Sequence, residues 1–323
     1  MVFKIKLVRG AHTTSRRPVR ECVWSLYVGI VLAPEPLMVV GTAPHGVSVR
    51  VAAVGDLHCG RTSRGTLQSI FARVSDDADL LLLAGDLTDR GHPDQARVLA
   101  AELPVLRVPA VAVLGNHDYE DGQPDEVRRI LTEAGLVVLD GDACEIHGVG
   151  IAGVKGFGGG FGQHAIGAWG ETIIKQFVHE AVDEALKLEA ALARLDTAAV
   201  VALLHYTPVA QTAEGEPREI LPFVGSSRLE EPLNRYPISA VFHGHAHRGA
   251  LEGTTAAGVP VYNVSLPLLV SAGSAQSAYR VIELPLTPPV AASREARASE
   301  SSKSRPRLDA VAGTSPVNRA VIS

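Results

Sequence analysis

The sequence predicts an α/β fold for residues 47–284, and three observations support this prediction. Short apolar runs occur throughout this stretch, and segments with apolar residues at helical spacing separate them, as helices separate interior strands. Each apolar run ends in a polar cluster. Because loops at the carboxyl ends of strands in an open α/β sheet converge on one crevice, these clusters predict one shared site.

Five apolar runs are the predicted interior strands of the sheet. They are 49–54, 80–84, 111–114, 200–204 and 238–242. Two later stretches, 259–264 and 278–284, also have the character of strands, and Gly and Pro turns join them.

Three segments, 66–74, 93–103 and 171–195, are predicted helices. The last is the clearest, because its apolar residues recur three and four positions apart and form one stripe along a long helix. The stripe consists of Ile174, Phe177, Ala181, Ala185, Leu188, Leu192 and Leu195.

Residues 1–46 are predicted to be an N-terminal extension that is poorly ordered. Basic residues precede a short apolar run, 22–33, which Pro34 and Pro36 interrupt. This run is too short to cross a bilayer as a helix, so we expect no stable membrane span. The arrangement also fits a secretory signal, with Arg16 and Arg17 as a twin-arginine pair. We expect a cytoplasmic protein, with export through this segment as the alternative.

The last segment, 285–323, is predicted to be a disordered tail. Prolines at its start are followed by a mixture of Ser, Ala and Arg with almost no periodic apolar signal. Such a segment cannot bury enough apolar surface to order itself. The sequence therefore predicts a single domain, 47–284, between two extensions.

The composition excludes several classes of partner and cofactor. The chain carries 30 Lys and Arg against 35 Asp and Glu, a net charge of −5, which argues against a nucleic-acid partner. Its three cysteines are too few and too scattered for a disulfide framework and form no CxxC pair. We expect a small-molecule substrate, and the oligomeric state stays open.

Five polar clusters follow the predicted strands. They are Asp56-Leu57-His58, Gly85-Asp86, Gly115-Asn116-His117-Asp118, His205, and Gly244-His245-Ala246-His247. Carboxylate, amide and imidazole groups together suit borderline divalent ions such as Mn²⁺, Fe²⁺, Zn²⁺ or Co²⁺. In an extended segment, Asp-x-His and His-x-His each put two side chains on the same face. Any one of these residues alone would more often be a cap or a surface group, but together they predict a metal site.

The order D-x-H, G-D, G-N-H-D, H and G-H-x-H resembles the calcineurin-like metallophosphoesterase superfamily over about residues 47–284. Within it, G-N-H-D with G-H-x-H is similar to the bacterial group that contains class III cyclic-nucleotide phosphodiesterases. The resemblance implies a four-layer αββα sandwich and a binuclear centre of two divalent ions. It also implies hydrolysis of phosphodiester or phosphomonoester bonds, with a metal-bridging hydroxide as nucleophile.

The resemblance also implies a role for each site residue. The first ion would be held by Asp56, His58, Asp86 and His247, and the second by Asp86, Asn116, His205 and His245, with Asp86 as the bridge.

Three further roles follow from the same resemblance. Asn116 and His117 would contact the substrate, and His117 would be the general acid that faces the scissile phosphate. Asp118 would orient the ring of His117. A histidine whose far nitrogen meets a carboxylate keeps one tautomer and donates a proton better when charged.

Other interpretations remain open from the sequence. A non-catalytic scaffold of the same fold that binds a protein partner is the alternative function, although all the expected ligands are present. A nuclease is disfavoured by the acidic balance of the chain. The G-D-x-x-D-R-G pattern at Asp86–Arg90 resembles protein phosphatases, but Leu114 and Asp118 depart from that subgroup.

The glycine-rich run 153–162 is either a connector or a rim that brings Lys155, Phe157 or Phe161 near the substrate. We expect loops 153–170 and 207–226 to select the substrate.

Overall fold

The computed structural model describes residues 37–40, 48–273 and 278–286. Most of the predicted N-terminal extension and of the predicted tail therefore lies outside the described residues. The strands are β1 (Met38–Val40), β2 (Ser48–Val54), β3 (Leu80–Ala84), β4 (Ala110–Val113), β5 (Val137–Leu139), β6 (Asp142–Ile146), β7 (Val149–Gly153), β8 (Ala199–Leu203), β9 (Ala240–His243), β10 (Glu252–Thr254), β11 (Pro260–Asn263) and β12 (Arg280–Pro285). The α-helices are α1 (Gln68–Asp77), α2 (Pro93–Glu102), α3 (Pro124–Glu133), α4 (Thr172–Leu192), α5 (Leu221–Val224), α6 (Ser227–Leu233) and α7 (Leu266–Ala272).

The strands form two mixed sheets. The five-stranded sheet has the order β12-β2-β3-β4-β5, and the seven-stranded sheet has the order β1-β6-β7-β8-β9-β11-β10. β2, β3 and β4 are parallel neighbours, as are β7, β8 and β9. All seven stretches predicted as strands form strands, and the three predicted helices form α1, α2 and α4.

The main difference from the sequence prediction lies between residues 124 and 153. α3, β5, β6 and β7 occupy this region, and no element was predicted there. β1 lies upstream of the predicted domain start at residue 47 and pairs in parallel with β6, with Met38 opposite Cys144. The short strands of this region carry too few residues to show a clear period of two.

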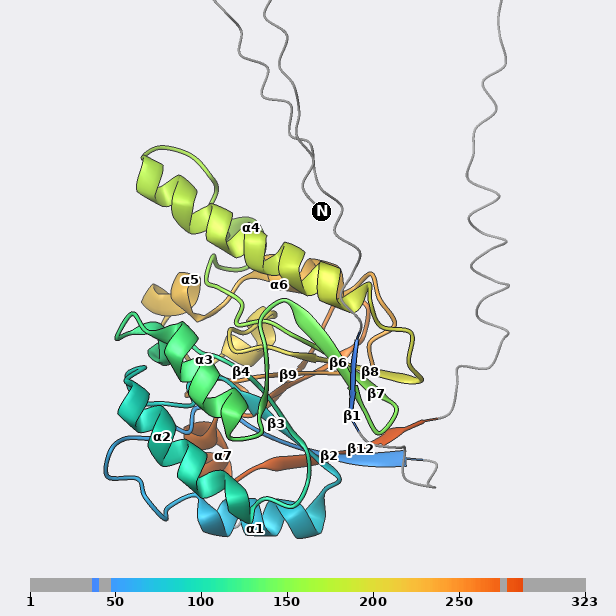
Figure 1. The fold of residues 1–323 in the computed structure, drawn as a ribbon. Coiled ribbons are helices and arrows are strands. Elements are labelled where there is room, and N and C mark those ends of the chain that lie inside the picture. Colours follow the sequence, from blue (N-terminus) through green and yellow to red (C-terminus); the bar gives the residue numbers. More distant parts are fainter. Residues whose placement is uncertain (1–36, 41–47, 274–277, 287–323) are drawn as a thin grey trace, which may run out of the picture. The chain divides into compact units, whose positions relative to one another are not determined.

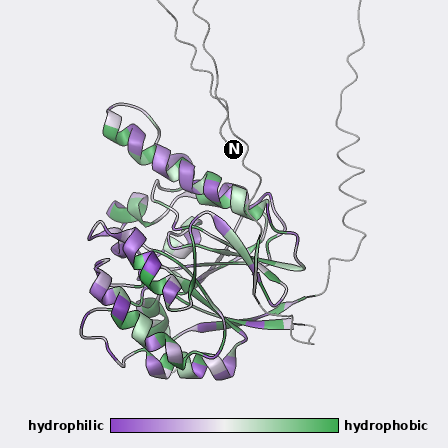
Figure 2. Ribbon diagram, in the orientation of Figure 1, coloured by the Kyte–Doolittle hydropathy of each residue, from purple (hydrophilic) through white to green (hydrophobic). Residues whose placement is uncertain are grey.

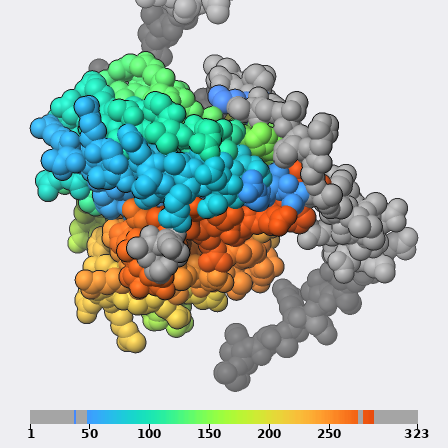
Figure 3. Space-filling model, turned by 90° about the horizontal axis from the view of Figure 1, so that it is seen from below, coloured from blue at the N-terminus to red at the C-terminus, as the bar shows by residue number. Residues whose placement is uncertain are grey.

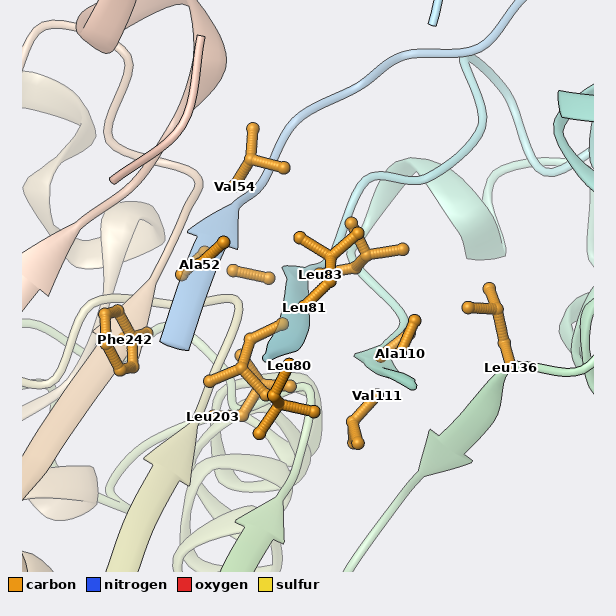
Figure 4. Packing of buried hydrophobic residues seen from close by; sticks show 14 of the residues in the cluster. Ala52, Val54, Leu80, Leu81, Leu83, Ala110, Val111, Leu136, Leu203 and Phe242 are labelled. Carbon is orange, nitrogen blue, oxygen red and sulfur yellow. The ribbon is translucent and has the colours of Figure 1, made fainter. Parts of the chain in front are cut away.

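The main core lies between the two sheets. Leu203 of β8 and Phe242 of β9 belong to the same buried cluster as Leu81 of β3 and Ala52 of β2. Figure 4 shows these side chains directed toward one another from the two sheets. β3 is buried at every position, as expected of a strand that is covered on both faces.

A second core separates the seven-stranded sheet from α4. Ala202 of β8 and Val241 of β9 point away from the first core and pack with Leu188 and Leu192 of the helix. The change of face between Leu203 and its neighbour Ala202 follows the two-residue period of a strand. Three members of the predicted stripe, Ala181, Leu188 and Leu192, are buried on α4, and the other members are only partly buried. The same helix also buries the carboxylate of Glu184, which was not predicted.

Helices cover the outer faces of both sheets. α1, α2 and α3 lie on the side of the five-stranded sheet, and α4 and α6 lie on the side of the seven-stranded sheet (Figure 1). Most strand residues are hydrophobic, whereas α2, α3 and α4 mix hydrophobic and hydrophilic positions (Figure 2). The predicted four-layer αββα sandwich is confirmed.

The last described strand pairs with a strand from the start of the domain. β12 pairs antiparallel with β2, with Arg280 opposite Ala53, and Figure 3 shows this late segment against the early one. Within the described ranges, none of the helices combines the length and apolar character that a bilayer span requires.

Candidate metal centre

The predicted ligands follow five strands that belong to both sheets. Asp56 and His58 follow β2, Asp86 follows β3, and Asn116 follows β4, all in the five-stranded sheet. The remaining three, His205, His245 and His247, follow β8 and β9 of the seven-stranded sheet. The site therefore forms where the carboxyl ends of strands from the two sheets meet.

The structure brings all seven predicted ligands together. Three groups have ligand atoms within 4.8 Å of one another: Asp56 with His58 and His247, His58 with Asp86 and His117, and Asp86 with His205 and His245. Asn116 joins them through its Oδ1 atom, 2.8 Å from Nε2 of His205. Two of these groups draw residues from both sheets. His117, expected not to be a ligand, also lies within reach of a shared ion.

Left-handed backbone conformations concentrate at this site. Asp56, His58, Asp86 and His245 have φ values of 58°, 43°, 47° and 68°, and His147 is the only other described non-glycine residue with positive φ. Each such residue costs about 1–3 kcal/mol and persists only where its surroundings impose it. The sharp turns let the chain present ligands immediately after each strand.

Two glycines leave room for the buried carboxylates. A Cβ atom on Gly244 would lie 2.3 Å from Oδ2 of Asp56, and one on Gly115 would lie 2.2 Å from Oδ1 of Asp86. No side chain fits at either distance. The two carboxylates therefore lie directly against backbone.

Asp56 is a buried carboxylate with strong hydrogen-bond donors around it. Its oxygens accept the His245 backbone N–H, at 2.9 and 3.1 Å, and Nε2 of His247 at 2.9 Å. Burial opposes its charged form, but the His247 hydrogen bond and the nearby imidazoles outweigh burial and lower the pKa of Asp56 to about 2. The same hydrogen bond raises the pKa of His247.

Asp86 occupies the centre of the cluster. It is 1% exposed, and its Oδ1 accepts the backbone N–H of His117 at 2.9 Å. Its Oδ2 lies 3.8 Å from Nε2 of His58 and 4.0 Å from Nε2 of His117. Nε2 of His205 lies 3.3 Å from its Oδ1. Asp86 and His58 each belong to two of the three ligand groups, and Asp86 is the only carboxylate that two groups share.

Three potential ligand atoms converge at His205. Nδ1 of His205 lies 3.0 Å from the Ala84 carbonyl, which can only accept, so Nδ1 donates there and Nε2 is the ring atom left for a metal ion. Nε2 lies 2.8 Å from Oδ1 of Asn116 and 3.3 Å from Oδ1 of Asp86. A divalent cation between these atoms would be coordinated by all three.

Two other histidines are also suited to a metal ion. Nε2 of His58 is buried and has no hydrogen-bond partner among the described residues. Nε2 of His245 donates to the Phe223 carbonyl at 3.1 Å, which leaves its Nδ1 as the ligand atom. Burial lowers the pKa of His58 and lowers that of His245 to about 3, so both rings are neutral at pH 7, as metal binding requires. The donor set fits a divalent metal.

The predicted contact between Asp118 and His117 is wrong. Nδ1 of His117 donates to the Asp89 carbonyl at 2.7 Å, and Glu120 lies 3.5 Å away. The physical reason is that both residues belong to one short 3₁₀ turn, His117–Tyr119, in which neighbouring side chains point in different directions.

Asp118 instead joins two loops of the site. Its buried carboxylate accepts the backbone N–H groups of Leu87, Thr88 and Gly115, at 3.1, 2.8 and 2.8 Å, and the Thr88 hydroxyl at 2.6 Å. Burial and the neighbouring Asp86 raise the pKa of Asp118. Asp118 therefore fixes the loops after β3 and β4 relative to each other.

Lys155 lies beneath the site, not on its rim. Its ammonium is 4.9 Å from the Phe157 ring centre and 5.4 Å from those of Tyr119 and Tyr206, and burial lowers its pKa. Its carbonyl accepts the backbone N–H groups of His205 and Tyr206, at 3.0 and 3.1 Å. The sequence indicated this residue but not its burial.

The carbonyls of Asp89 and Phe223 orient His117 and His245, and neither was predicted from the sequence. Backbone acceptors leave no signal in residue type, so no pattern could have identified them.

Replacing Gly244 with Ala is expected to weaken metal binding on the order of 10- to 100-fold, because the added methyl displaces the Asp56 carboxylate. Calorimetric titration with Mn²⁺ measures the effect. Gly60→Ala is the control, since a Cβ there meets only Oγ of Ser63, at 3.7 Å. Equal affinities in the two variants would contradict the tight contact at Gly244.

Replacing Asp118 with Ala is expected to lower the free energy of unfolding by about 3 kcal/mol or more, because buried N–H groups lose their acceptor. Urea denaturation of the metal-free protein measures this loss. The exposed Asp121→Ala, in the same loop, should change stability by less than about 0.5 kcal/mol. If Asp118→Ala kept full stability and lost only activity, an orienting role on His117 would return.

Comparisons with known proteins identify the family of the chain. A model of the calcineurin-like phosphoesterase family matches residues 49–249. Among solved structures, the phosphopantetheinyl hydrolase of Mycobacterium tuberculosis is 15% identical, with a TM-score of 0.53, over 76% of this chain and 98% of its own. The protein TT1561 of Thermus thermophilus is 14% identical, with a TM-score of 0.45, over 74% of this chain and 100% of its own. No protein of curated function matches the sequence. The chain therefore belongs to the calcineurin-like phosphoesterase family and is a metallophosphoesterase.

Proposed function

We propose that the protein hydrolyses small phosphodiesters or phosphomonoesters with two divalent metal ions and with His117 as the general acid. The observation that carries this proposal is the position of Asp86. Its Oδ2 lies 3.8 and 4.0 Å from Nε2 of His58 and His117, and its Oδ1 lies 3.3 Å from Nε2 of His205 in the group that also contains His245. One buried carboxylate shared by two groups of ligands is the arrangement that a binuclear centre needs.

Seven residues would hold the two ions. Asp56, His58, Asp86 and His247 form the first set, and Asp86, Asn116, His205 and His245 form the second. Divalent ions at these positions would polarise the phosphoryl oxygens and lower the pKa of a coordinated water toward neutrality. The mixed oxygen and nitrogen donors suit Mn, Fe, Zn or Co.

His117 is arranged to give a proton through one atom. Its Nδ1 is committed to the Asp89 carbonyl, so Nε2, on the side of Asp86, is the atom that can donate to the departing ester oxygen. The side chain is 37% exposed, which leaves a substrate access to it. Asn116 lies next to it on the same turn and would bind a phosphoryl oxygen through its amide NH₂ group.

The rival function is a non-catalytic scaffold. Such a protein has no need to keep strained backbone at the ligands or room for their carboxylates. The class III cyclic-nucleotide phosphodiesterase group remains a prediction for the substrate, and the acidic chain remains a poor match for nucleic acid.

The purified full chain, reconstituted with Mn²⁺, is expected to turn over at least one of four substrates. The panel is p-nitrophenyl phosphate, bis-p-nitrophenyl phosphate, and a 2′,3′- and a 3′,5′-cyclic nucleotide. Chelation should abolish turnover and added metal should restore it, because the ions activate both water and substrate. The diester-to-monoester ratio would identify the subgroup. No turnover on the whole panel would favour the scaffold.

His117→Ala is expected to lower kcat about 10²- to 10⁴-fold, the usual contribution of a general acid. Metal content, measured by elemental analysis, should stay at the wild-type level. His179→Ala, at an exposed histidine of α4, is the matched control and should keep wild-type kcat. If His117→Ala lost bound metal, the residue would be a ligand instead of the acid.

A further inference from the structure

A pocket lies directly beside the candidate metal centre. His245 and His247 form part of its lining, and its volume is about 390 Å³. Small-molecule sites begin at roughly 300 Å³, so the pocket can take a whole substituent of a substrate. His117 is not among the residues that line it.

One side of the pocket is aliphatic. Pro217, Ile220 and Val224 form this side, and all belong to the loop that leads into α5 and to α5 itself. The side chain of Ile220 is 42% exposed. A substrate group that covers it would remove apolar surface from water.

This aliphatic side is fixed relative to the metal ligands. Val224 is buried in a small apolar cluster with Ala213 and with Ala246, the residue between His245 and His247. The Phe223 carbonyl accepts the Nε2 proton of His245. The aliphatic side of the pocket therefore packs against the loop that carries two of the proposed ligands.

The lining of the pocket also includes a cation, Arg248. Arg248 directly follows His247, is exposed, and its guanidinium has no hydrogen bond or ion pair within the described part of the chain. Glu216, its neighbour in the pocket, uses its carboxylate to accept the Arg248 backbone N–H at 2.7 Å. The guanidinium has five donors and no acceptor, so it is suited to an anionic phosphoryl oxygen.

We propose that this pocket binds the non-leaving ester group of a phosphodiester, and that this group is apolar, with Ile220 as the main contact. The inference rests on the proposed function, since it places a diester at the metal centre. The leaving group must lie toward His117, which protonates it. Because His117 does not line the pocket, the group held there is the one that stays on phosphorus, and a monoester has no such group.

Two synthetic diesters test the proposal. Phenyl p-nitrophenyl phosphate and methyl p-nitrophenyl phosphate release the same leaving group and differ only in the group assigned to the pocket. With the Mn²⁺-reconstituted full chain, kcat/KM for the phenyl diester should exceed that for the methyl diester by about 10- to 100-fold. The difference should lie mainly in KM.

Ile220→Asn should reduce this phenyl-to-methyl ratio toward one, and the milder Ile220→Ala should reduce it in the same direction. Val270→Asn is the matched control, because Val270 of α7 is similarly exposed, at 49%, and does not line the pocket. Its ratio should equal that of the wild type. Arg248→Gln should raise KM for both diesters alike.

A wild-type ratio near one, or an unchanged ratio in both Ile220 variants, would overturn the pocket assignment while the hydrolase function stood. If Val270→Asn also reduced the phenyl-to-methyl ratio toward one, the effect would not be local to the pocket, and the pocket assignment would again be overturned. No turnover of either diester, or of any substrate in the panel above, would remove the proposed function together with this inference.

Discussion

The burial of two carboxylates between two sheets is the constraint on which the site depends. Asp56 and Asp86 are 2% and 1% exposed, where an unpaired charge would be severely penalised. The Asp56 carboxylate accepts hydrogen bonds from a backbone N–H and an imidazole, and the Asp86 carboxylate accepts one from the backbone N–H of His117. These hydrogen bonds offset the penalty of burial. These donors come from the loops after β9 and β4, whereas the carboxylates themselves follow β2 and β3. The carboxylates therefore determine how close the loops must approach.

The strained loops persist because the strands beneath them are rigid. β3 and β4 are buried at every position, and the left-handed Asp86 lies two residues beyond the end of β3. Asp118 adds a second restraint, because it accepts three hydrogen bonds from the loop after β3 and one from Gly115 in its own loop after β4. Rigid strands and a buried carboxylate together hold the ligands near one geometry before any ion binds, which is the preorganisation that a functional site needs.

The sequence predicted the interior strands and all seven residues that meet at the site, because apolar runs and the polar residues that end them carry distinct signals. It did not predict α3 or β5 to β7, whose short segments show little period. It also assigned Asp118 to His117, although neighbouring residues in one helical turn do not face each other. The acceptors that do orient His117 and His245 are carbonyls, which every residue possesses. Sequence therefore identifies side-chain chemistry better than it identifies backbone partners.

Two of the three ligand groups combine side chains from both sheets. An ion shared by such a group acts as a cross-link across the sandwich, and the unfolded chain offers no equivalent assembly. Binding to the native state alone adds to its stability in proportion to the logarithm of the free cation concentration. The stability of the folded protein thus depends on the concentration of free divalent cations around it. Removal of these cations would destabilise the fold as well as impair the chemistry of the site.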